Sequence, residues 1–221
     1  MTGHTRYDRP EGRQAEMNDM DMAEAERSDL AAFLAGLTPQ QWQMPTLCER
    51  WQVKDVVAHM ISYDDLSTAG LIRRFLKGRL LWANQAGVDE FTSHTPDQLL
   101  ELFTTHLRPR GLAAGFGGMI GLVDGTIHHQ DIRRGLGIPR QIPPQRLHRV
   151  LTAIRTNPRL GVPWRTRGLR LEATDLEWST GKGVLVSGPG EVLLMAMTGR
   201  RGITDELAGP GLARLAGRIG D

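Results

Sequence analysis

Apolar residues recur at helical spacing through the first two-thirds of the chain, and this pattern limits the possible folds more than any other feature. Apolar side chains three and four residues apart lie on one face of an α-helix and must be buried against other elements. Several such helices in succession predict a helical bundle. The predicted helices cover residues 22–37, 53–60 and 66–85, the segment that starts at Thr95, and residues 120–134.

The last third of the chain follows a different pattern. Leu169 and Leu171 alternate with polar residues, which is the period of a half-buried β-strand. Residues 178–183 have the composition of a turn that leads into a second apolar segment at Val184, so we expect a β-hairpin. Short helices are expected at 146–155, 190–197 and within 203–219.

Together these patterns predict three regions. Residues 1–21 are polar and carry no apolar stripe, which predicts a disordered extension, or a start codon upstream of the true one at Met17, Met20 or Met22. A helical bundle is expected over residues 22–140, and a small α+β domain over residues 145–221. The expected fold class is therefore mainly α.

Composition and charge exclude several classes of protein. The chain has one cysteine, so it cannot form an intramolecular disulfide, and this suits the reducing cytoplasm. No apolar run approaches the roughly 18 residues that cross a bilayer, and the polar start is unlike a secretory signal. The 27 Lys and Arg residues nearly balance 25 Asp and Glu residues and are not clustered, so we expect no nucleic-acid partner. Since the helices and the hairpin account for the apolar residues, we expect a monomer or a weak oligomer.

Three residues on two predicted helices are candidate metal ligands. His59 lies on the same apolar face as Val56, and His128 follows Asp124 by four residues, which places these two on one helical face. Three nitrogen and oxygen donors are the number that a catalytic divalent metal takes while a coordination position stays open. From the spacing alone, a histidine on an apolar face is more often a core residue, and an Asp–His pair four residues apart is a common surface pair.

Two neighbours of His128 have different expected roles. His129 lies about 100° further round the helix, so it cannot share a metal with His128, and we expect a supporting or surface role. Asp131 follows His128 by three residues and is placed to orient the second ring nitrogen of that histidine. An ion pair of Asp131 with Arg133 or Arg134 is the alternative.

Other reactive or charged residues give weaker signals. Cys48 has no histidine beside it in the sequence and is expected to be a small buried residue. Four arginines are candidates for binding an anionic thiol or a substrate carboxylate, with solvated charges as the alternative: Arg133, Arg134, Arg140 and Arg200.

Three segments resemble one known family. The segment from Thr46 to His59, TLCERWQVKDVVAH, resembles the motif before the first metal-ligand histidine in the DinB-like, mycothiol-dependent maleylpyruvate isomerase family. The segment from Asp124 to Arg140, DGTIHHQDIRRGLGIPR, is similar to the second ligand motif of that family. Residues 167–178, 188–192 and 198–200 resemble its small C-terminal domain, so the resemblance covers about residues 22–219.

The resemblance implies a DinB-like four-helix bundle that holds one divalent metal, usually zinc. The implied ligands are His59, Asp124 and His128, with Asp124 standing where the family has glutamate. The resemblance also implies a thiol enzyme, with mycothiol as co-substrate, that acts on a small electrophile by S-transfer or cis–trans isomerisation. Alternatives are a non-catalytic metal-binding or regulatory bundle and a hydrolase that uses metal-bound water.

Overall fold

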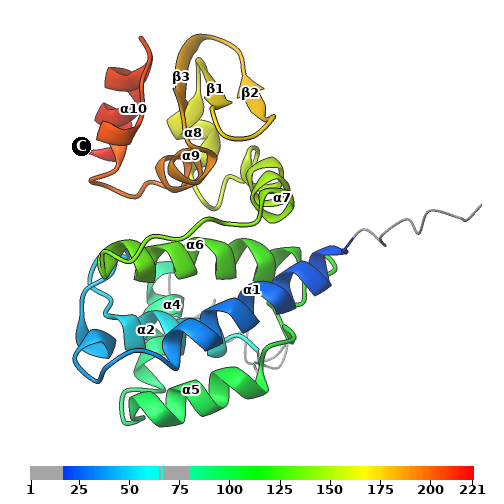
Figure 1. Ribbon diagram of the computed structural model, residues 1–221, viewed down its shortest axis with the longest axis vertical. Coiled ribbons are helices and arrows are strands. Elements are labelled where there is room, and N and C mark those ends of the chain that lie inside the picture. The colour runs from blue at the N-terminus through cyan, green and yellow to red at the C-terminus, as the bar shows by residue number, and fades with distance from the viewer. Residues whose placement is uncertain (1–16, 65, 67–79) are drawn as a thin grey trace, which may run out of the picture.

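The computed structural model describes residues 17–64, 66 and 80–221. The helical bundle occupies the lower half of Figure 1, and α6 lies on its upper side, facing the C-terminal part of the chain. Among the described residues, no helix combines the length and the apolar character that crossing a membrane requires. The helices of the bundle region are α1 (Asp19–Leu34), α2 (Val53–Ile61), α4 (Leu80–Asp89), α5 (Pro96–Thr105) and α6 (Met119–Gly135).

The predicted helices of this region are found, with shifted ends. The helix expected over 22–37 begins at Asp19, because the Asn18 side chain accepts a hydrogen bond from the Asp21 backbone N–H at 3.0 Å. Much of the helix expected over 66–85 lies outside the described residues, which include α4 at its C-terminal end. The helices expected from residue 53, after Thr95 and from residue 120 correspond to α2, α5 and α6.

The C-terminal part combines short helices with a small sheet, so the mainly α fold with an α+β C-terminal part is confirmed. The sheet has the strand order β2-β1-β3, and the short helices lie beside it (Figure 1). Its elements are α7 (Pro144–Ile154), α8 (Val162–Thr166), β1 (Leu169–Ala173), β2 (Ser179–Gly181), β3 (Val184–Gly188), α9 (Gly190–Met197) and α10 (Leu212–Ile219).

The hairpin expected between Leu169 and Val184 is wrong. The β1 and β3 strands are parallel, and the antiparallel partner of β1 is the short strand β2, which lies within the expected turn. The chain crosses the start of β1 between β2 and β3. This close crossing requires glycine, because a Cβ at Gly183, where φ is 140°, would lie 2.2 Å from the Gly168 carbonyl oxygen.

Two hydrophobic clusters meet along α6. Ile132 belongs to the bundle cluster, together with residues such as Leu30 and Phe103. Leu122 and Ile127 belong instead to the cluster that is centred on the C-terminal part. Because α6 is covered by apolar groups on two sides, the polar side chains from Thr126 to Asp131 are buried.

Candidate metal centre

The three predicted ligand residues come together between α2 and α6. His59 lies in the last turn of α2, while Asp124 and His128 lie one turn apart on α6. The Asp124 Oδ1 atom is 3.6 Å from His59 Nε2 and 3.4 Å from His128 Nε2. One donor atom from each residue lies within 4.8 Å of the other two. The spacing correctly predicted the helical face of each side chain, and their meeting is what the resemblance implied, while metal ligation stays a prediction.

The electrostatics of this cluster keep Asp124 ionised. Burial alone would raise the Asp124 pKa, but the adjacent imidazoles of His128 and His59 lower it well below its usual range. Burial likewise opposes the charged form of His128, whereas Asp124 and Asp131 raise its pKa to about 9. An ionised carboxylate beside two imidazoles is a donor set suited to a divalent transition metal.

Asp131 fixes the ring of His128 from the other side. The Asp131 Oδ2 atom lies 3.0 Å from His128 Nδ1, which leaves Nε2 of the same ring directed at Asp124. Of the alternatives for Asp131, the structure supports contact with His128. The ion-pair partner of Asp131 is Arg200, which donates to both carboxylate oxygens at 2.8 and 2.6 Å. Burial raises the Asp131 pKa, and the Arg200 guanidinium more than offsets this, so that the pKa is lowered.

Arg200 therefore connects the C-terminal part of the chain to the three candidate metal ligands His59, Asp124 and His128, which we call the ligand cluster. It follows α9 in the sequence and reaches Asp131 on α6. In metal sites, the histidine ligands are commonly oriented by a hydrogen bond to a carboxylate, and that carboxylate is in turn hydrogen-bonded to a further group. The sequence offered Arg200 as an anion-binding residue or a solvated charge, and the structure shows a buried ion pair instead.

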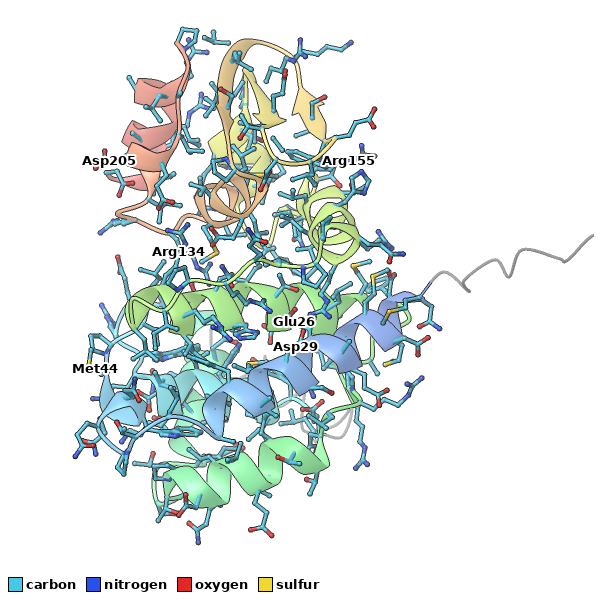
Figure 2. All side chains as sticks on the ribbon, viewed as in Figure 1. Glu26, Asp29, Met44, Arg134, Arg155 and Asp205 are labelled. Atoms are coloured by element: carbon cyan, nitrogen blue, oxygen red, sulfur yellow. The ribbon has the colours of Figure 1, made fainter. Side chains whose placement is uncertain are left out.

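His129 faces away from the cluster. Its Nδ1 atom lies 2.8 Å from the Glu26 carboxylate on α1, and its Nε2 atom accepts a hydrogen bond from Arg133. Glu26 also accepts hydrogen bonds from Arg140 and Arg146 and is fully buried (Figure 2 labels Glu26 on α1). Sequence reasoning missed Glu26, although its position four residues before Leu30 placed it on the apolar face of α1.

The arginines that follow His128 are committed to internal contacts. Arg133 lies over the Phe33 ring, with 3.9 Å between the guanidinium carbon and the ring centroid. Arg134 pairs with Glu191 and Glu206, and it lies between α6 and the C-terminal part in Figure 2. These contacts do not support the anion-binding role that was considered for these residues and for Arg140.

Cys48 lies beside the cluster, a position that the sequence did not reveal. Its Sγ atom, one ring nitrogen of His128 and one carboxylate oxygen of Asp131 all lie within 4.8 Å of one another, so these three residues form a second group that could hold a metal. The loop that carries Cys48 is held against α6 by a hydrogen bond from the Leu47 N–H to the Asp131 carbonyl. Burial, with a smaller contribution from Asp131, raises the Cys48 pKa to about 12, which opposes a nucleophilic role.

Aromatic rings and a cavity complete the site. The Trp51 ring packs on His59, with 4.8 Å between the ring centroids, and Tyr63 meets the edge of the same imidazole at 5.5 Å. A cavity of about 580 Å³ opens onto His59, Asp124 and His128. The cluster is thus accessible to a small molecule on the cavity side and enclosed by protein on the other.

The comparisons with known proteins give one family model, which matches part of the chain, and two solved structures with a similar fold. Residues 23–110 match the family model described as the mycothiol maleylpyruvate isomerase N-terminal domain. The fold is similar to a crystal structure of mycothiol-dependent maleylpyruvate isomerase in which a histidine is mutated to alanine, with a TM-score of 0.58 and 16% identity. A second crystal structure of a mycothiol-dependent maleylpyruvate isomerase gives a TM-score of 0.53 and 15% identity. Each alignment covers 87% of this chain and 91% of the other. A search of curated protein sequences gives no significant match.

Proposed function

Because residues 23–110 belong to the mycothiol maleylpyruvate isomerase N-terminal domain family, we propose that this chain is a divalent-metal-dependent thiol enzyme. Its reaction would be S-transfer to a small electrophile, or cis–trans isomerisation by addition and release of a thiol of the mycothiol type. The observation that carries the proposal is the meeting of His59, Asp124 and His128 at an open cavity.

The donor set fits a divalent metal, and zinc suits it best. Two imidazoles and one carboxylate form a common ligand set of catalytic zinc, and three protein ligands leave a position for a small molecule. Asp124 is shorter by one methylene than the glutamate of the family, yet its Oδ1 atom already lies 3.4 and 3.6 Å from the two imidazole nitrogens. When bound there, the metal would favour the thiolate form of the co-substrate.

The chain's own residues would position this chemistry. Asp131 and Arg200 hold the His128 ring in one orientation, and Trp51 covers the side of His59. The nucleophile would be the thiol of the co-substrate, since the raised pKa of Cys48 does not support a nucleophilic role for this residue. The single cysteine also supports a cytoplasmic location, where low-molecular-weight thiols stay reduced.

The test is thiol-dependent turnover with matched histidine variants. Purified protein would be assayed with a thiol and an electrophile before and after metal depletion, together with His59→Ala, His128→Ala and His148→Ala. His148 is exposed on α7, so its variant controls for the loss of a histidine as such. We expect activity to require the thiol, the metal, His59 and His128, and to survive in His148→Ala.

The other outcomes identify the alternatives. Turnover of an ester or amide that needs the metal but no thiol would indicate a hydrolase. Metal that raises the melting temperature without any turnover would indicate a binding or regulatory bundle. Thiol-dependent activity that survives in His59→Ala would overturn the proposal directly.

A further inference from the structure

One wall of the cavity is apolar and distinct from the ligand cluster. The charged groups of the cavity include His59, Asp124, His128 and Arg200. The start of α6 and the segment before it contribute mainly apolar side chains instead: Leu112, Ala113, Phe116, Met119, Ile120 and Val123. In small-molecule sites the polar groups fix the orientation of the ligand, and an apolar lining of this kind covers the apolar part of the ligand.

Phe116 stands out in this wall because it is exposed. The residue is among those that line the cavity and is 87% exposed, so its side chain stands at the rim with nearly all of its surface in water. Its backbone is also unfavourable, because φ is +54°, a region that residues with a large side chain rarely adopt. Glycine would occupy this position without strain, as it does at Gly117 and Gly118.

The segment that carries Phe116 is held at both ends. On one side, the Leu112 N–H donates to the Tyr63 carbonyl at the end of α2. On the other side, the Gly121 N–H on α6 donates to the Ala113 carbonyl at 2.8 Å. The Phe116 ring is therefore presented at the rim by a fixed turn. Strain retained in a fixed turn beside a cavity indicates a role in binding.

We infer that the electrophilic substrate has an apolar body about the size of an aromatic ring, which packs between Phe116 and the apolar wall. This inference rests on the proposed function, and it adds the class of substrate. The reactive carbon of the substrate would face the ligand cluster, while its apolar body would displace water from the wall and cover the exposed face of Phe116.

The test compares two unreactive probes with the same carboxylate and double bond. Cinnamate carries a phenyl group where crotonate carries a methyl group, so the ratio of their Kd values measures how much the apolar body contributes to affinity. We expect isothermal titration calorimetry to show cinnamate binding about tenfold more tightly than crotonate, as the burial of a phenyl ring allows. In Phe116→Ala this preference should fall severalfold, while Phe116→Leu should keep most of it.

Trp164→Ala is the matched control. Trp164 is also a large exposed aromatic side chain, at 72% exposure, and it does not line the cavity. This variant should keep the full preference for cinnamate. Equal Kd values for the two probes in the unmodified protein, or a preference that Phe116→Ala leaves within twofold, would overturn the inference.

The result is separable from the proposed thiol chemistry. His59→Ala should lose turnover yet keep the preference for cinnamate, because the apolar wall does not include the ligand residues. A protein that shows the preference but no thiol-dependent turnover would refute the proposed function, whereas turnover without the preference would refute only the inferred substrate class. Phe116→Ala should also match the unmodified protein in melting temperature, since the lost ring is exposed.

Discussion

Replacing Asp131 by asparagine changes the charge behind His128 without changing the space that the side chain fills. In the structure, Asp131 is fully buried, contacts His128 Nδ1 at 3.0 Å and accepts two hydrogen bonds from Arg200. Asparagine can accept at one of these positions, but it cannot balance the Arg200 charge. The substitution therefore tests the two roles of Asp131 together, the orientation of His128 and the neutralisation of Arg200.

The size of the effect follows from the burial of this pair. Loss of an outer carboxylate that orients a metal-ligand histidine typically lowers metal affinity about 10- to 100-fold, or about 1.4–2.8 kcal/mol. Because the Arg200 side chain is only 15% exposed, its charge would also stay largely buried without a counterion. Breaking a buried pair in this way costs about 3–5 kcal/mol of unfolding free energy.

The assay combines zinc affinity, by competition with a chelator, and urea unfolding of Asp131→Asn. Glu172→Gln is the matched control, since Glu172 pairs with Arg170 on the surface, where both side chains are about half exposed. The free energy of unfolding of Glu172→Gln should fall by less than about 1 kcal/mol, and its zinc affinity should be unchanged. Wild-type zinc affinity in Asp131→Asn would refute the positioning role, and a stability loss no larger than that of the control would refute the argument from burial.

Three further predictions concern the rest of the fold. Burial raises the Glu26 pKa, but His129 and Arg140 more than offset this and lower it from 4.5 to about 2. The ionised Glu26 carboxylate therefore adds about 3 kcal/mol to the free energy of unfolding. This contribution is complete above pH 4.5 and is lost as the pH falls through about 2. Glu26→Gln should remove this pH dependence from urea unfolding curves between pH 5 and 2, and an unchanged profile would contradict it. Gly183→Ala should destabilise the protein by more than about 2 kcal/mol, because its Cβ would lie 2.2 Å from a carbonyl oxygen. Gly217→Ala, in open space on α10, should instead raise stability by about 0.5–1 kcal/mol, and thermal unfolding of both glycine variants would measure the two effects.

The parts of the site that the sequence predicted are those that local periodicity determines. Asp124 and His128 share a face of α6 because they are four residues apart, and His59 shares the buried face of α2 with Val56. The meeting of the two helices depends on long-range packing, and the resemblance to a known family supplied that information. The helices of the bundle were predicted in the same way as these helical faces, because apolar residues recur in them at helical spacing.

The parts that the sequence did not predict depend on contacts between distant segments. The partner of Asp131 is 69 residues away, and Glu26 meets His129 across 103 residues, so neither contact leaves a local pattern. The hairpin was wrong because alternation predicts strands but not the direction in which they pair. The crossing at Gly183 has the same turn composition as a hairpin, and only the geometry separates the two.

Metal ligation by His59, Asp124 and His128 is tested by the metal content per chain, measured by elemental mass spectrometry of protein purified without a metal-chelating tag. We expect nearly one zinc per chain, lost in His59→Ala, Asp124→Ala and His128→Ala and retained in His148→Ala. The absence of bound metal in the unmodified protein, even after zinc is added, would contradict the proposed metal site. Full metal content in the three ligand variants would contradict it equally.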